Sequence, residues 1–504
     1  MRVTMSEMLK AISSEKTPAT CDMLSLEVSL RRSVVNEDRR EFFRRSVVSS
    51  ALGLAATSIG NSSIAAATKV DDERQPTVQL PRGRVPLSFI IDDSTCLVNM
   101  GKFCMPQFAA TYPERKDYQK PWQQWPDEIP DAFVREFGEW CAEHGVKGKY
   151  SIVPYPACVG WLDRTLPGWS QQQLRDSLKL VRDLMLPNWD IHPEMITHTR
   201  VIDLKNGRPF ADYSPSHMEN SYPQQDVSVD YLASYLAYAL QILKNCDLPC
   251  EGITTPGGFG NRVKDKLPEA VRQSVSDVYG CELPHYFKYV VGQDEDPTPR
   301  MEAFRSVDGQ KPEFVMNVPA GTGDWFGGWD GVLEPSAEKY CNADATEGAM
   351  VEWIKRGQPA VMLCHWPGMY CNGRKTGFRA FQSVVQSIAK RFGSVTQWMK
   401  VSEIARYWAA KELTKLSREG GRLVLDAPFA CSDFTINVPG GFTSAILKPS
   451  ESENGLERKN LRIVQSLAAL GQNSLFVDSS RRSEEAHSWI CIDLPEGRSE
   501  IQFK

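Results

Sequence analysis

The chain has 504 residues, of which 41% are hydrophobic and 24% are charged, and its formal net charge at pH 7 is -5. A chain of this length and composition can bury a large core in more than one domain, which excludes a wholly disordered protein. Beyond the N-terminal region, no stretch combines many lysines and arginines with aromatic residues, so we do not expect a nucleic acid as partner.

The N-terminal region has the features of an export signal. Two adjacent arginines at 39–40 precede a weakly apolar run at 46–60, which is rich in alanine and serine, and then a short alanine run. This order is typical of a twin-arginine signal with a small-residue cleavage site. We therefore expect residues 1–67 to form the signal region, residues 68–84 a linker, and the mature protein to be periplasmic or extracellular without a membrane span. The alternative is an N-terminal membrane anchor, although about fifteen weakly apolar residues are few for a span.

Beyond residue 84, the hydrophobic pattern predicts alternating strands and helices. Short apolar runs bounded by turn residues predict strands, and apolar residues at helical spacing predict helices. The strands lie at 85–91, 149–153, 252–255, 313–318 and 358–363, and the helices at 131–145, 171–186 and 229–246. This alternation predicts an α/β fold, either a barrel or a layered sheet, whose chemistry lies at the C-terminal ends of the strands.

Two segments at such strand ends carry residues from which a metal site can be built. Asp92 and Asp93 follow the first strand, and Glu194 and His198 stand four residues apart after a strand-like segment. One aspartate can ligate a metal ion while its neighbour accepts a proton, and Glu194 and His198 share a face if they lie on a helical turn. This combination indicates a metal-assisted hydrolase. Taken separately, the aspartates could cap a loop, and the second pair could be a surface ion pair.

Further segments complete a series of motifs that is known from one family. In chain order, the five segments lie at 89–93, 190–198, 254–258, 324–325 and 363–365. This series resembles the five motifs of the polysaccharide deacetylase family, carbohydrate esterase family 4. The resemblance covers residues 85–412 and implies a distorted (β/α) barrel, and residues 402–408 are similar to the final helix of such domains.

The resemblance implies a mononuclear metal site. Asp93 and His198 match two ligands of the family pattern, and Glu194 stands where the family has a first histidine. Glutamate can also ligate a divalent ion, but two carboxylates and one imidazole form a harder ligand set than the usual one. We expect zinc first, with manganese, iron, cobalt and nickel open. His192 is the alternative ligand, and it ranks second because we expect it to point elsewhere if Glu194 faces the metal.

The resemblance also implies catalytic roles. Asp92 matches the general base, and His365 matches the acid that protonates the leaving amine or alkoxide. Asp324 would tune His365, and Trp325 would form a wall of the substrate pocket. From the residues alone, His365 could instead be a hydrogen-bonded core histidine, and Trp325 could simply fill the barrel mouth.

The third motif departs from the family pattern. The family has an arginine that steadies the base, and this chain has Thr254 at that position. Backbone N–H groups of Gly257 and Gly258 could still stabilise an oxyanion of the substrate, because glycine lets the main chain approach a ligand closely.

After about residue 415, short alternating runs replace the longer elements. They lie at 422–426, 434–438, 442–447, 475–477, 489–493 and 500–503 and are separated by turn residues. This pattern predicts a small antiparallel, β-sandwich-like domain over residues 418–504. Such a domain could bind carbohydrate or cap the barrel.

The function predicted from these patterns is that of an exported, metal-dependent hydrolase. It would remove acetyl groups from N- or O-acetylated sugars in a polysaccharide or oligosaccharide. One alternative is a carbohydrate-binding or scaffold protein without turnover, as the residues Glu194 and Thr254 indicate. Another is an enzyme that hydrolyses non-peptide C–N bonds in a non-sugar substrate, because the fold alone does not determine the chemistry.

Overall fold

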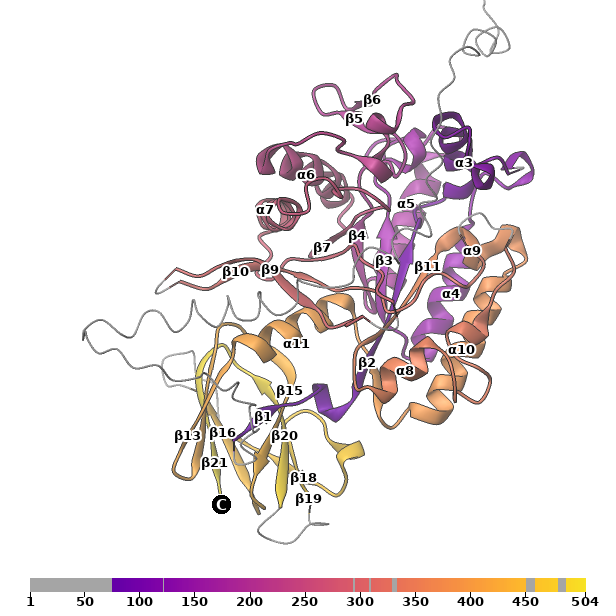
Figure 1. Ribbon diagram of the computed structural model, residues 1–504. Coiled ribbons are helices and arrows are strands. Elements are labelled where there is room, and N and C mark those ends of the chain that lie inside the picture. Colours follow the sequence, from indigo (N-terminus) through magenta and orange to yellow (C-terminus); the bar gives the residue numbers. More distant parts are fainter. Residues whose placement is uncertain are drawn as a thin grey trace, which may run out of the picture. The chain divides into compact units, whose positions relative to one another are not determined.

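Figure 1 shows the computed structural model of the chain. The structure describes residues 75–120, 122–292, 295–307, 310–328, 333–449, 458–478 and 486–504. Residues 72–504 form one compact unit. The predicted signal region, residues 1–67, lies outside the described residues, and so does the first part of the predicted linker.

A parallel sheet carries the first predicted strands. Its order is β11-β2-β3-β4, and a fifth strand, β12, pairs with the start of β2. The bounds are β2 (Val85–Asp92), β3 (Gly148–Ile152), β4 (Trp189–Pro193), β11 (Ala360–His365) and β12 (Thr396–Trp398). Every residue of β2 is buried, as expected for a strand of a parallel sheet that is covered on both faces. On β2, Phe89 stacks on Phe381 of α10 (Thr376–Phe392) with ring centroids 4.4 Å apart.

A second sheet has the order β7-β8-β10-β9. Its strands are β7 (Gly252–Thr254), β8 (His285–Phe287), β9 (Arg300–Arg305) and β10 (Glu313–Asn317), and only the β9–β10 pairing is antiparallel. The two sheets meet at isolated parallel bridges, one between Glu194 and Thr254 and one between Asp324 and Leu363.

In the described part of the chain, the strands of the distorted barrel that the resemblance implies do not form one closed hydrogen-bonded ladder. The predicted α/β class with parallel strands is confirmed, but the strands form two open sheets.

Helices follow the strands and pack through one apolar face. On α6 (Val229–Asn245), Leu232, Leu236 and Leu240 recur every four residues and are buried, and this helix packs against α7 (Leu267–Tyr279). The predicted helix at 171–186 is α5 followed by a single π-helical turn. The remaining helices named in Figure 1 are α3 (Met100–Thr111), α4 (Asp131–Glu143), α5 (Gln171–Leu180), α8 (Ala349–Lys355), α9 (Trp366–Tyr370) and α11 (Val401–Leu413).

The C-terminal residues form two sheets that share one hydrophobic core, as in the predicted β-sandwich-like domain. All six predicted runs contain a strand, although the run at 442–447 becomes one only at Ala445. The two five-stranded sheets have the order β1-β15-β20-β19-β18, with β1 at Thr77–Val78, and β13-β14-β21-β16-β17. The β18–β19 pair is parallel and so departs from the predicted antiparallel arrangement. The bounds are β13 (Lys415–Glu419), β14 (Arg422–Ala427), β15 (Cys431–Pro439), β16 (Ala445–Pro449), β17 (Lys459–Asn460), β18 (Arg462–Val464), β19 (Ser474–Asp478), β20 (His487–Leu494) and β21 (Gly497–Phe503).

The sandwich shares its core with the preceding helix. One hydrophobic cluster includes Trp408 of α11 together with Leu425 and Ile436 of the two sheets. The described end of the predicted linker is also not a free connection, because β1 (Thr77–Val78) pairs with β15. A shared core of this kind favours the structural-cap interpretation of the C-terminal domain.

None of the helices in the described part of the chain combines the length and apolar character needed to cross a membrane.

Candidate metal centre

The structure brings the three predicted metal ligands together. Asp93 follows β2, and Glu194 and His198 follow β4. The Nε2 atom of His198 lies 2.8 Å from Oδ1 of Asp93 and 3.2 Å from Oε1 of Glu194. The backbone N–H of Asp93 donates to Oε2 of Glu194 at 2.7 Å, which ties the two strand ends together. All three residues are buried, and their ligand atoms lie within 4.8 Å of one another.

The donor set fits a divalent cation. Both carboxylate oxygens of Asp93 are buried, and neither accepts a well-formed hydrogen bond from the described residues. A buried carboxylate in that condition is unfavourable unless a positive charge compensates it. Burial alone would lower the pKa of His198, but the charges of Asp93 and Glu194 outweigh burial and raise that pKa well above its ordinary value. Without a metal, a proton on His198 supplies the positive charge, so a metal ion and this proton compete for the site.

The segment that carries His198 is not a helical turn, the conformation in which Glu194 and His198 would have shared a face. Met195 and His198 have left-handed backbone conformations, with φ of 53° and 60°. The carboxylate of Glu219 accepts the backbone N–H groups of Ile196 (3.2 Å), Thr197 (3.0 Å) and His198. Because one carboxylate collects three consecutive N–H groups, the chain curls around Glu219 instead of forming helical hydrogen bonds.

Glu219 is a positioning residue that sequence reasoning did not assign. It lies in a polar segment between β6 (Arg208–Pro209) and α6, yet its side chain is fully buried. The hydroxyl of Tyr235 donates to its Oε1 atom at 2.6 Å. Burial raises the pKa of Glu219 to about 7, although the hydrogen bond from Tyr235 opposes this shift. In contrast, His217 of the same segment is partly exposed and pairs with Asp212 at 3.0 Å.

Asp92, the predicted base, is held by a buried lysine. Nζ of Lys149, on β3, donates to Oδ1 of Asp92, to the carbonyl of Ile91 at 3.2 Å and to Oγ of Ser151 at 2.8 Å. Burial is the main reason why the pKa of Asp92 is raised; the charge of Glu194 adds to this effect, and the charge of Lys149 opposes it.

Lys149 thus places a cation beside the predicted base, in a chain that has Thr254 where the resemblance would place an arginine. Sequence reasoning identified Lys149 only as the start of a strand. The available signal was a lysine in an apolar strand, two residues before Ser151 and therefore on the same face.

The predicted acid has the partner that the resemblance implies. Oδ2 of Asp324 accepts the backbone N–H of His365 at 3.0 Å and lies 2.8 Å from Nδ1 of the same residue. Burial would lower the pKa of His365, but the hydrogen bond to Asp324 and the charges of Asp93 and Asp92 outweigh burial and raise it to about 10. The His365 side chain is 27% exposed, unlike that of a core histidine. It is the cross-strand partner of Asp92 in the β2–β11 pair, so base and acid stand side by side at adjacent strand ends.

The residues predicted to contact substrate have different surroundings. Trp325 is partly buried, and its ring packs at 59° against Tyr340 with centroids 4.9 Å apart. The N–H of Gly258 donates to the carbonyl of Asn220 at 2.8 Å. A Cβ at Gly258 would lie 2.8 Å from that carbonyl oxygen, so this glycine serves a close backbone contact, and its N–H is not available to an oxyanion. Gly257 has φ of 39°, a conformation that favours glycine.

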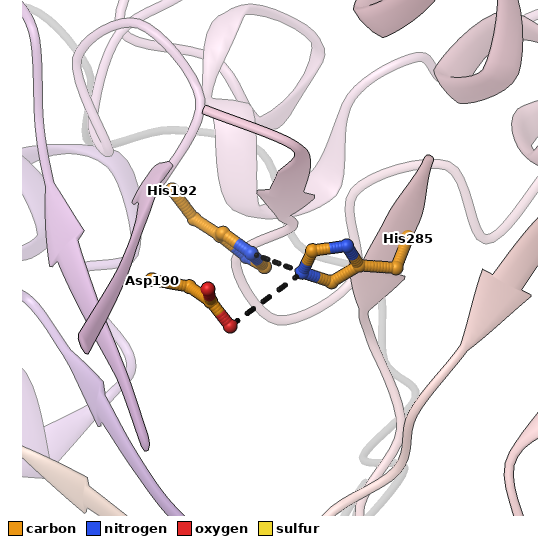
Figure 2. Close-up of side chains that lie close together, drawn as sticks. All are labelled: Asp190, His192 and His285. Carbon is orange, nitrogen blue, oxygen red and sulfur yellow. Dashed lines mark hydrogen bonds and ion pairs between the residues drawn. The ribbon is translucent and has the colours of Figure 1, made fainter. Parts of the chain in front are cut away.

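His192, the alternative ligand, does not join the Asp93 group. Its Nε2 atom lies 2.8 Å from Nε2 of His285, and both side chains are fully buried. Figure 2 shows the two rings pointing toward one another, beside the carboxylate of Asp190. Burial lowers the pKa of His285 to about 4 and that of His192 well below its ordinary value. These three residues form a group of their own.

Comparisons with known proteins leave the family undecided. No protein-family model and no curated protein matches the chain. Solved structures that align with it include a mutant of a CE4 family pseudoenzyme (9% identity, 65% of this chain, 70% of that chain, TM-score 0.28). Another is a mutant CE4 family pseudoenzyme with restored enzymatic activity (10%, 65%, 70%, 0.27). A third is endo-glycoceramidase II from Rhodococcus sp. (10%, 85%, 99%, 0.28). TM-scores this low do not establish a common fold or function, so the function has to be inferred from the geometry of the site.

Proposed function

We propose that the protein is an exported, metal-dependent hydrolase that removes acetyl groups from N- or O-acetylated sugars. One observation carries the proposal. Asp92, held by Lys149, and His365, held by Asp324, are partners across adjacent strands. They lie next to a buried group of three residues that could ligate a metal ion. Perturbed titratable groups that converge at parallel strand ends are typical of catalytic sites.

Asp93, Glu194 and His198 would hold the cation. When bound, a divalent ion at this place supplies Lewis acidity, which polarises an acyl carbonyl and makes water easier to deprotonate. Two carboxylates neutralise its charge, which suits zinc, manganese, iron, cobalt or nickel.

The chain's own residues supply the proton transfers. Asp92 accepts a proton from the water that attacks the acetyl carbon, and Lys149 holds its carboxylate in place. His365 then donates a proton to the sugar nitrogen or oxygen as the bond to the acetyl carbon breaks. The contact between Asp324 and Nδ1 of His365 orients the imidazole ring, so that Nε2 faces away from Asp324. Acetate and the free amine or alcohol are the products.

Two features support an acetylated glycan outside the cytoplasm as substrate. Trp325 directly follows Asp324 and is partly exposed, so its ring can stack on a sugar face. The twin-arginine pattern at 39–40 supports export to the periplasm or the exterior.

A carbohydrate-binding protein without turnover is the second candidate, because Thr254 replaces an arginine and the N–H of Gly258 is already bonded. The cation of Lys149 beside Asp92 favours the enzyme over this candidate. Hydrolysis of a C–N bond in a non-sugar substrate would use the same residues. Only an assay with both kinds of substrate distinguishes this activity from sugar deacetylation.

The test is acetate release by residues 68–504 from a panel of acetylated glycans and non-sugar amides, after chelation and reloading with single divalent metals. We expect release that one metal restores and that Asp92→Asn abolishes, whereas His217→Gln, outside the site, leaves the rate unchanged. Metal binding without release from any glycan would favour the binding protein, and release only from the amides would favour the non-sugar hydrolase.

A further inference from the structure

A second cluster of metal-ligating side chains lies in the core and has no part in the proposed reaction. It consists of Asp190 and His192 on β4 and His285 on β8. The Nε2 atoms of the two histidines are 2.8 Å apart, and Nε2 of His285 is 3.9 Å from Oδ2 of Asp190. Figure 2 shows the His192 ring and the Asp190 carboxylate both facing the same nitrogen of His285.

A glycine, Gly252, makes room for this cluster. Gly252, on β7, is the register partner of His285 on β8. A Cβ at this position would lie 2.5 Å from Nε2 of His192 and 2.7 Å from the carbonyl oxygen of His285. Any larger residue would therefore displace the His192 ring, and the two imidazoles meet because this position of β7 carries no side chain.

Outer partners orient the ligands. The two oxygens of Asp190 accept the backbone N–H and the hydroxyl of Ser402, each at 2.7 Å. The hydroxyl of Thr254 lies 3.4 Å from Nδ1 of His192. Partners of this kind on the far atom of a histidine and on a ligating carboxylate are typical of metal sites, where they hold the ligand ring or carboxylate in position. Each oxygen of Asp190 keeps a second lone pair for a cation.

Two Nε2 atoms that face one another need either a hydrogen or a cation between them. Without a cation, one ring must donate to the other. Two imidazole ligands of a tetrahedral zinc ion, each at about 2.0–2.1 Å, have their nitrogens roughly 3.3 Å apart. Both imidazoles could ligate one ion if the observed separation of 2.8 Å widened by about 0.5 Å, and Oδ2 of Asp190, now 3.9 Å from Nε2 of His285, would have to move closer. The charge of Lys149, which would oppose a cation nearby, is paired with Asp92.

We propose that Asp190, His192 and His285 form a second divalent-metal site, with zinc as its first candidate. Two imidazoles and one carboxylate suit zinc. Both imidazoles are inaccessible to solvent, so the role is structural: the ion links β4 to β8 and, through Ser402, to the start of α11. This site is separate from the Asp93 group and does not depend on the proposed activity.

The test is the zinc content of the full-length protein after reloading and dialysis, measured by elemental analysis. We expect two zinc ions per chain in the wild type, one in His285→Gln and one in Asp93→Asn. Glutamine at 285 keeps a donor for His192 and so preserves the fold. The matched control, His217→Gln, should keep two. A zinc content that His285→Gln leaves unchanged overturns the proposal. A wild-type content of one that falls to none in His285→Gln supports the second site and counts against zinc at Asp93.

A second measurement needs no variant. Anomalous scattering at the zinc edge from crystals of the reloaded wild type should give a peak between Asp190, His192 and His285, in addition to one at Asp93. A peak at Asp93 alone would refute the second site and leave the proposed function intact. A peak at the second site alone would support the second site and would count against zinc, but not against another divalent metal, at Asp93.

Discussion

Replacing Lys149 by methionine tests the central electrostatic feature of the site. Lys149 is fully buried, and its ammonium group contacts Asp92, which is also buried. Methionine has a similar length but no charge, so Lys149→Met leaves the Asp92 carboxylate in a low-dielectric environment without its cation. We expect Asp92 to take up a proton, and a protonated carboxyl cannot act as a base.

The expected magnitudes follow from the burial of both groups. Breaking a buried ion pair by removing one partner costs about 3–5 kcal/mol of unfolding free energy. Loss of a general base lowers the rate about 10²- to 10⁴-fold. The double variant Lys149→Met/Asp92→Asn removes both charges, so its stability should return to within about 1.5 kcal/mol of the wild type, and the coupling energy should exceed about 2 kcal/mol.

Urea unfolding at pH 7 of the wild type, both single variants and the double variant measures this coupling. Lys147→Met is the matched control, because Lys147 is partly exposed and its pair with Glu403 at 3.0 Å is a surface pair. We expect the control to change stability by less than about 1 kcal/mol. If Lys149→Met is no more destabilising than Lys147→Met and shows no coupling to Asp92→Asn, the pairing described above does not hold the base.

Three further predictions concern the rest of the site. Asp324→Asn removes the charge beside His365 and should lower kcat by about 10²-fold or more with little change in KM; an equal further loss from the residual rate of a His365→Gln variant would contradict this. Gly258→Ala should destabilise the protein by about 1–3 kcal/mol in urea, whereas Gly421→Ala, whose Cβ meets nothing within 4 Å, should change it by less than about 0.5 kcal/mol. Glu219→Gln should weaken metal binding about 10- to 100-fold in a competition titration; unchanged affinity would show that the Glu219 charge is not needed to hold the ligand turn.

Local pattern was sufficient for much of the fold and for the ligands that sit at strand ends. The apolar run before Asp92 is β2, and the six alternating runs after residue 415 are strands of the sandwich. These features depend on residues close in the chain, because the period of an apolar pattern determines whether a segment is a strand or a helix. Asp93, Glu194 and His198 could be predicted from the sequence for the same reason, because each follows a recognisable strand.

Only the tertiary structure determined which groups hold these residues in place. Lys149 and Asp92 are 57 positions apart in the chain, and His192 and His285 are 93 apart. No periodicity connects such residues, and their meeting depends on strand order and register. The segment that carries His198 curls around Glu219, where a helical turn was one possibility, and a backbone carbonyl accepts the N–H of Gly258. In both cases a hydrogen-bonding partner from a distant segment outweighed the local preference, because buried backbone groups must be satisfied wherever the fold brings a partner.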